Sequence, residues 1–372
     1  MSRDTLSDVL RGMRLRGAVF FNVSASNAWA AEAPPSRELA PLMMRGVDHV
    51  IEYHAVARGS CWAGIPGGPS VQLFAGDVVM FPHGDAHVVS SAPGMRGDPD
   101  FTWLARTRVD QLPLKLSYSG ESVLHSALPD GDADTSVVCG FLGCDVQPFS
   151  PLIASLPHLL HLRASDDNAW IASFTQQALA ESHARRPGGE AMLARMSEMM
   201  FVDAVRRYSD QLPPDSEGWL AGLRDRFVGR ALALMHAQPA QRWTIDELGR
   251  CVGLSRSALH ERFAQLIGVP PMQYLAQWRM QAAARLLLET RGTVASIAVD
   301  VGYDSEAAFA RAFKRSVGKP PAAWRRERRE RREASVGSLA SASIPAAVSA
   351  AQAVAPRAQH GNRDRREKVE GL

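Results

Sequence analysis

Apolar and polar positions divide the chain into a strand-rich first half and a helical second half. In the first half, short apolar runs alternate with turns that contain glycine or proline, which is the pattern of antiparallel strands in a sandwich or barrel. A short helix is expected within residues 1–16, and a long loop over residues 92–135, which are rich in Gly, Asp, Ser and Pro. The expected strands are Val50–Val56, Gly59–Ala63, Val71–Leu73, Val78–Pro82 and Val137–Leu142.

Beyond residue 169, apolar residues recur at helical spacing. Helices are expected over residues 169–181 and 190–208, and the second contains four methionines that suit either a plain core or a dimerisation face. Pro213–Ser216 predicts a linker. Residues 334–372 are rich in Ala, Ser and Pro without periodicity, which predicts a disordered tail. The methionines are Met192, Met196, Met199 and Met200.

One pattern of residues occurs twice near the C-terminus, and each copy predicts a helix, a glycine-centred turn and a second helix. The threonines suit N-caps, as do Ser255 and either Asp304 or Ser305 for the second helices. The glycines allow a sharp turn, and the apolar pairs four residues apart fall on one buried face. The opposite face is left for a partner. The copies are Thr244, Gly253, Leu259 and Phe263, then Thr293, Gly302, Phe309 and Phe313.

The charge is unevenly distributed along the chain. Residues 222–333 hold 20 lysines and arginines against 11 aspartates and glutamates, whereas residues 1–221 hold 17 against 25. The basic part is therefore the part that carries the repeated pattern, as attraction to phosphate requires. This asymmetry favours a nucleic-acid partner for the C-terminal part and argues against one for the N-terminal part.

The second copy resembles the signature of AraC/XylS-type transcriptional regulators, and the resemblance extends over about residues 222–326. It implies two helix-turn-helix units joined by one long helix near residues 272–289, which read neighbouring turns of promoter DNA. Arginine is the best hydrogen-bonding partner for guanine, so Arg311 is the strongest candidate for base contact. The matching residues are Ile297, Gly302, Ser305, Phe309, Arg311, Phe313, Gly318, Pro320, Pro321 and Trp324. The expected DNA contacts are Arg256, Ser257, His260, Arg262, Ala307, Arg311, Lys314 and Arg315.

The strand-rich part carries a second resemblance. The spacing of Gly76-Asp77, Pro82, Gly84 and His87 is similar to the second conserved motif of cupins. Together with Gly59–Trp62 and Cys139-Gly140, it resembles the cupin-type sensor domain of the RclR-like subgroup of AraC regulators, over roughly residues 45–145. The resemblance implies a barrel with His87 at its mouth. Metal-binding cupins carry a His-x-His pair and a glutamate on preceding strands, and only His54 stands in that region.

Histidines and cysteines supply the candidate chemistry of the barrel. His54, His83 and His87, with Cys61 or Cys139, could bind zinc or copper, or each histidine could be an ordinary turn or core residue. Accessible thiolates sense oxidants, whereas buried thiols are inert. Cys61 and Cys139 form the most attractive redox pair. Cys144, the third candidate, lies five residues after Cys139 and would face the opposite side of one strand. Cys251 is expected to be a small core residue.

These patterns predict an α+β chain with a cupin-like barrel over residues 1–165 and a helical linker or dimerisation segment over 166–215. A double helix-turn-helix domain follows over 216–333, and a tail over 334–372. We expect a cytoplasmic transcriptional regulator without catalytic activity, obligate cofactor or membrane segment. Its expected partners are promoter DNA, a second copy, RNA polymerase, and an oxidant or small-molecule effector. The alternatives are a cupin metal enzyme with a DNA-binding appendage and a constitutive DNA binder with an inert barrel.

Overall fold

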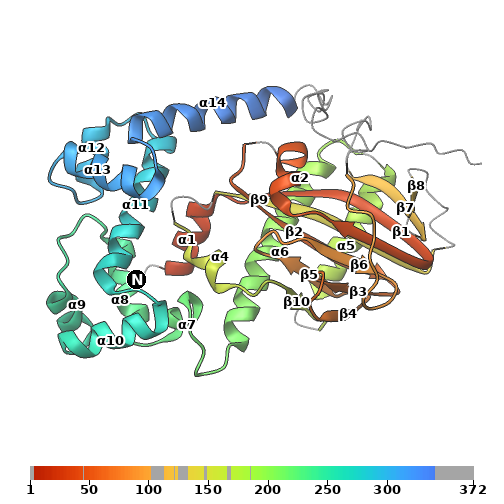
Figure 1. Ribbon diagram of the computed structural model, residues 1–372, viewed down its shortest axis with the longest axis horizontal. Helices are drawn as coiled ribbons and strands as arrows, with labels where there is room; N and C mark the ends of the chain where they lie inside the picture. Colours follow the sequence, from red (N-terminus) through yellow and green to blue (C-terminus); the bar gives the residue numbers. More distant parts are fainter. Residues whose placement is uncertain are drawn as a thin grey trace, which may run out of the picture.

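The computed structural model describes residues 4–44, 46–101, 113–120, 122–124, 133–145, 149–165, 169–184 and 186–339. Figure 1 shows a β-sheet body at one end and a helical body at the other. Helices α1 (Thr5–Met13), α4 (Pro151–Ser155) and α7 (Trp219–Arg224) lie between the two bodies. The expected α+β organisation is confirmed. Among the described residues, no helix is both long and apolar enough to cross a membrane.

The strands form one curled, mainly antiparallel sheet built on the long strand β1 (Arg16–Ala33). The first half of β1 pairs with β9 (Thr135–Cys144), and its end pairs with β6 (His87–Ser90). The sheet order is β10-β5-β2-β9-β1-β6-β3-β4. The other strands in this order are β2 (His49–Arg58), β3 (Ser60–Gly64), β4 (Ser70–Phe74), β5 (Val78–Phe81) and β10 (Leu160–Leu162).

Two further strands correct the prediction of a loop over residues 92–135. Strand β7 (Leu114–Gly120) runs parallel to β1, and β8 (Ser122–Leu124) pairs with β7. Within β7, apolar residues alternate with Lys115 and Ser117, which is a strand pattern that the surrounding Gly, Asp and Pro obscured. Residues 102–112, 121 and 125–132 of the same segment lie outside the described residues.

The two faces of the sheet build two different cores, because successive side chains of a strand point to opposite faces. In β9, Cys139 packs inside the curl of the sheet, and Cys144 belongs to the core on the outer face. Helix α2 (Ser36–Met43) packs against β2. Helices α5 (Ala169–Ala184) and α6 (Gly189–Gln211) cover the outer face, where the Tyr53 hydroxyl lies 2.6 Å from the Ser197 hydroxyl of α6.

The helical body contains the two predicted helix-turn-helix units. Thr244 forms a capping box at the start of α9, Thr293 caps α12, and Ser255 and Ser305 cap the second helices. Gly302 has a φ of +83°, and a Cβ there would meet the Ala240 carbonyl oxygen at 2.7 Å. The helices are α8 (Val228–Ala237), α9 (Ile245–Val252), α10 (Arg256–Ile267), α11 (Pro271–Glu289), α12 (Val294–Asp300), α13 (Glu306–Val317) and α14 (Pro321–Leu339).

Two expectations in this body need correction. Cys251 is exposed, because Leu248, Gly249 and Val252 form the buried face of α9 and Cys251 falls beside it. Helix α14 continues to Leu339, past residue 334 where the tail was expected to begin. The alternating charges of residues 325–333 support the helix up to that point. The rest of the expected tail, residues 340–372, lies outside the described residues.

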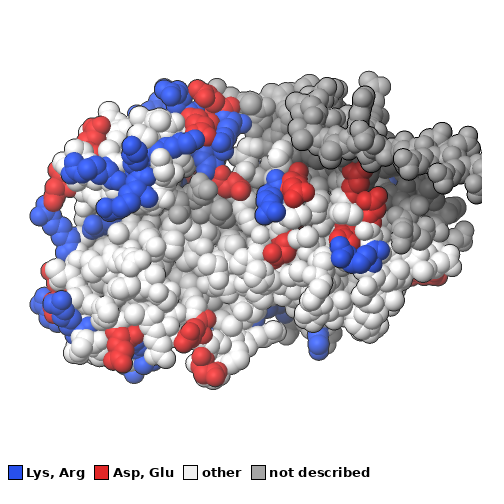
Figure 2. Space-filling model, in the orientation of Figure 1, with Lys and Arg blue, Asp and Glu red and all other residues white. Residues whose placement is uncertain are grey.

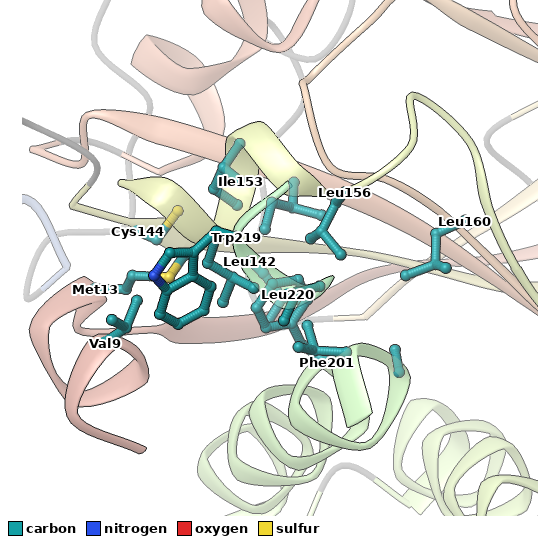
Figure 3. Packing of buried hydrophobic residues seen from close by; sticks show 14 of the residues in the cluster. Val9, Met13, Leu142, Cys144, Ile153, Leu156, Leu160, Phe201, Trp219 and Leu220 are labelled. Carbon is teal, nitrogen blue, oxygen red and sulfur yellow. The ribbon is translucent and has the colours of Figure 1, made fainter. Parts of the chain in front are cut away.

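The outer core of the sheet continues without interruption into the first helix-turn-helix unit. Figure 3 shows Trp219 of α7 packed among Val9 and Met13 of α1, with Leu142 and Cys144 of β9 close by. The same cluster reaches Phe263 of the first unit. Residues of the second unit form a separate cluster that includes Ile297, Phe309, Phe313 and Trp324. The sheet body and the first unit therefore share one core, and the second unit has its own.

Candidate functional site

The second helix of each helix-turn-helix unit presents an exposed face. Helix α10 buries Leu259 and Phe263, and helix α13 buries Phe309 and Phe313, as the spacing predicted. All eight residues expected to contact DNA are exposed on these two helices. Figure 2 shows lysine and arginine side chains clustered on the helical end of the molecule. This end therefore offers two exposed helices beside positive charge, as contact with DNA phosphate requires.

Both arginines of α10 are engaged within the protein. Arg256 lies 3.3 Å from the Asp246 carboxylate. Arg262 donates from Nε and Nη2 to Asp225, whose carboxylate also accepts hydrogen bonds from the first backbone N–H groups of α8. Arg262 thus joins α10 to the start of α8, a structural role that its sequence position does not reveal.

Two cations of α13 are available for a ligand. Arg311 and Lys314 of α13 are exposed, and their side chains make no hydrogen bond or ion pair within the described part of the chain. They stand on the face opposite Phe309 and Phe313. A charged side chain without an internal partner can bind phosphate or a base edge without first breaking an ion pair.

The curled sheet encloses a pocket whose wall is mostly apolar. Its apolar lining includes Phe21, Trp29, Leu116 and Phe141. The polar groups in the wall come from β1, β2, β6, β7 and β9, because alternate residues of these strands point inward. They are Glu32, Glu52, His54, His87, Tyr118 and Cys139.

Three of these side chains form a hydrogen-bonded row. His54 Nδ1 lies 2.9 Å from Cys139 Sγ, and His54 Nε2 lies 2.7 Å from His87 Nε2. His87 Nδ1 is 3.0 Å from the Asp85 carbonyl oxygen, which can only accept, so this nitrogen donates. Neutral His87 then accepts from His54, and neutral His54 accepts from the Cys139 thiol. Hydrogen-bond donation therefore runs in one direction along the row, from the Cys139 thiol to the Asp85 carbonyl.

Burial keeps the groups of this row neutral. It lowers the pKa of His54 and lowers that of His87 to about 4. It also raises the pKa of the Cys139 thiol. Burial raises the pKa of Glu52 to about 8, although the Ser36 hydroxyl donates to its Oε1 at 2.9 Å and partly offsets the shift. At neutral pH the inner end of the pocket is polar but carries little net charge.

The residues of the pocket do not fit a metal ion in this arrangement. His54 and His87 use their facing nitrogens to hydrogen-bond each other, so neither lone pair is directed at a shared ion. His83, the third expected ligand, lies elsewhere, stacked on His158 and 2.8 Å from the Leu156 carbonyl. Within the described ranges, no three His, Cys, Asp or Glu side chains are arranged to hold a metal. Of the metal set considered from the sequence, the structure brings His54, His87 and Cys139 together, whereas His83 lies elsewhere and Cys61 does not line the pocket.

The three barrel cysteines differ in their surroundings. Cys139 lines the pocket, and Cys61 is buried in the same apolar cluster without lining it. Cys144 is buried on the opposite face of the sheet, as its offset of five residues predicted, so it does not line the pocket. The sequence reasoning missed Glu52, although its position two residues before His54 on one strand places both side chains on the same face.

Comparisons with known proteins agree with both halves of the structure. A family model described as Cupin matches residues 4–210, and one described as Helix-turn-helix domain matches residues 248–327. A putative AraC-like transcription regulator of Streptomyces lividans is 29% identical over 325 residues, which cover 87% of this chain and 98% of that protein.

Two further relatives are regulators with specific names. The HTH-type transcriptional regulator AlkR of Acinetobacter baylyi is 26% identical, over 87% of this chain and 99% of its own length. The RCS-specific HTH-type transcriptional activator RclR of Escherichia coli is 25% identical, over 74% of this chain and 84% of its own length. The chain belongs to the AraC-type family of DNA-binding transcriptional regulators and carries an N-terminal cupin domain.

Proposed function

We propose that the cupin domain of this regulator senses a small effector in its barrel pocket and thereby alters promoter binding. The observation that carries the proposal is the polar row of Cys139, His54 and His87 at the wall of an otherwise apolar pocket. A sensor must interact unequally with its effector in two conformational states. The row can provide this difference, because an effector that hydrogen-bonds to one of the three side chains changes the hydrogen-bond partners of the other two.

The pocket chemistry favours an uncharged, largely apolar effector with one hydrogen-bonding group. An anion would face the ionised Glu32 and no lysine or arginine among the described lining residues. A cation would lose its hydration against aromatic walls without a fixed negative charge at the inner end, because Glu52 is protonated at neutral pH. A neutral polar group can exchange hydrogen bonds with His54 and His87 at low cost. Such an effector would bind without covalent chemistry.

An oxidant is the second candidate effector, because Cys139 lies on the pocket wall beside His54. Hypochlorous acid would convert the thiol to sulfenic acid with release of HCl, and condensation with the Cys61 thiol would then release water and form a disulfide. His54 can take the thiol proton in this reaction. The buried, protonated state of Cys139 slows the reaction and makes this the weaker candidate.

One experiment separates the two effectors. The reduced full chain is titrated with its own upstream DNA by fluorescence anisotropy, before and after one equivalent of hypochlorous acid. Oxidant sensing requires a change in affinity that a thiol reductant reverses and that Cys139→Ser abolishes. Cys144→Ser is the matched control, because this thiol is also buried on the same strand but faces the other core. Tight DNA binding that the oxidant leaves unchanged would rule out the redox form and leave the neutral ligand.

For DNA recognition we propose that α13 makes the stronger contacts, through Arg311 and Lys314. This follows from their exposure without an internal partner in the described structure, whereas Arg256 and Arg262 of α10 are held by aspartates. Ser257, His260, Ala307 and Arg315 complete the proposed DNA-facing surface. DNA bound across both helices would hold the regulator at its target promoters, where RNA polymerase, the other expected partner, also binds.

We further propose that α6 pairs two copies of the chain. Met192 is 39% exposed and Met199 is 53% exposed, and they lie seven residues apart on one face of the helix, whereas Met200 is fully buried. Exposed methionines at heptad spacing suit a helix-helix interface. Light scattering should give a dimer for the wild type and a monomer for the Met192→Lys, Met199→Lys double variant. A wild-type monomer at micromolar concentration would exclude this interface.

A further inference from the structure

A buried ion pair links the sheet body to the second helix-turn-helix unit. Arg328 of α14 donates to the carboxylate of Asp48, and the two side chains are only 10% and 7% exposed. A second polar contact crosses nearby, where the Phe149 backbone N–H donates to Gln281 Oε1 of α11 at 3.1 Å. Separating the two members of a buried pair is costly, because each charge loses a close partner while it is still shielded from water, so such a pair resists opening.

On the helical side, the pair is connected to the helix expected to read DNA. The Arg328 guanidinium lies over the Trp324 ring, 5.2 Å from its centre. Trp324 in turn packs edge-on against Phe313, with ring centres 5.6 Å apart. Phe313 lies on the buried face of α13, and Arg311 lies on the opposite, exposed face. Three direct contacts therefore lead from Asp48 to the recognition helix.

On the sheet side, Asp48 is held firmly. It immediately precedes β2, and its backbone N–H donates to the Cys144 carbonyl of β9 at 3.3 Å. It therefore extends the pairing of two central strands. Asp48 can transmit the position of the sheet to whatever binds its carboxylate.

The two helix-turn-helix units depend differently on the sheet body. The first unit is fused to it through the shared core that contains Trp219, whereas the second has a separate core. The orientation of the second unit relative to the first therefore rests on α11 and on contacts such as this ion pair. Two recognition helices must reach successive major grooves about 34 Å apart, so a small error in this orientation weakens simultaneous binding.

We propose that the Asp48–Arg328 pair is a positioning contact, by which the cupin domain holds the second helix-turn-helix unit in the orientation that binds both DNA subsites at once. Neither residue touches DNA in this role. The pair gives the cupin domain a direct part in DNA recognition, whatever effector it senses.

The test compares two DNA duplexes by fluorescence anisotropy with the full chain. One is the operator mapped by footprinting on its own upstream DNA, and the other has the subsite of the second unit scrambled. Arg328→Met and Asp48→Asn are each expected to weaken binding to the intact operator about tenfold and to leave the scrambled one unchanged within about twofold. The double variant should be no worse than either single variant, because both remove one interaction.

The control is Arg326→Met, which removes a positive charge from the exposed face of the same helix. It should leave the ratio of the two affinities as in the wild type. The proposal is overturned if Arg328→Met keeps the wild-type ratio, or if the effects of Asp48→Asn and Arg328→Met simply add. Asp48→Asn and Arg328→Met remove the same pair from opposite sides, one from the sheet body and one from α14. If circular dichroism shows that one variant is misfolded, the other variant still tests the proposal.

Discussion

Glu52 is a buried carboxyl whose neighbour His87, with Nε2 at 3.8 Å from Oε2, is kept neutral by burial. Its side chain is 3% exposed, and burial raises its pKa to about 8 in the folded protein, against an ordinary value of 4.5. As the pH rises above 4.5, the unfolded chain loses this proton while the folded chain keeps it. The stability that the protonated carboxyl contributes is therefore complete below pH 4.5 and is lost as the pH rises towards 8.

The perturbation is Glu52→Gln, which keeps the size of the side chain and an oxygen for the Ser36 hydroxyl. Linkage between these two pKa values predicts that the wild type loses about 3–4 kcal/mol relative to this variant between pH 5 and pH 8. His54 and His87 titrate in both proteins, so their contribution largely cancels in the difference. The variant should therefore become progressively more stable than the wild type as the pH rises.

The assay is urea unfolding followed by tryptophan fluorescence at pH 5, 6, 7 and 8. Glu32→Gln is the matched control, since Glu32 also lines the pocket but its pKa is lowered by the hydrogen bond from Arg96. Glu32 is ionised throughout this range, so the difference in free energy of unfolding between wild type and Glu32→Gln should not depend on pH. If the difference in free energy of unfolding between wild type and Glu52→Gln is also independent of pH, the reasoning is refuted, because Glu52 would then ionise normally in the folded state.

Three further predictions concern the helical body. Arg311→Ala should cost about 1–3 kcal/mol in specific DNA binding by anisotropy, and an unchanged operator affinity would remove it from the DNA-facing surface. Thr244→Ala should lower the free energy of unfolding by about 1 kcal/mol in urea, because it removes the hydroxyl that accepts from the Glu247 backbone N–H and donates to the Glu247 carboxylate. Gly302→Ala should lower it by more than Thr244→Ala does, since the added Cβ meets the Ala240 carbonyl at positive φ; equal effects would contradict the close contact.

The sequence predicted those features that depend on residues close together in the chain. The capping of α9 by Thr244 and the buried pair of Phe309 and Phe313 follow from spacings of three and four residues, and the structure has them. The opposite faces of Cys139 and Cys144 follow from the alternation of one strand. Local periodicity is enough for each of these, because one helix or strand contains all the atoms concerned.

Features that join distant segments could not be read in this way. The bond of Arg262 to Asp225 and that of Arg328 to Asp48 connect residues far apart in sequence. Arg262 was therefore expected only to contact DNA, and nothing near Arg328 in the chain points to Asp48. The separation of His83 from His54 depends on where the turn after β5 leaves the sheet. Histidine type and motif spacing suggested one ligand cluster, but three-dimensional placement divides it.

The continuous core between the sheet body and the first helix-turn-helix unit limits how the chain can be divided. A fragment that begins at residue 216 would expose the apolar face of Trp219 and Leu220, which now packs against α1 and β9 (Figure 3). Such a fragment should be prone to aggregate unless α1 and α4 are supplied. For the same reason, a hybrid that carries the cupin domain of a relative should fold only if the α1 and α4 of that relative match the apolar face of Trp219 and Leu220.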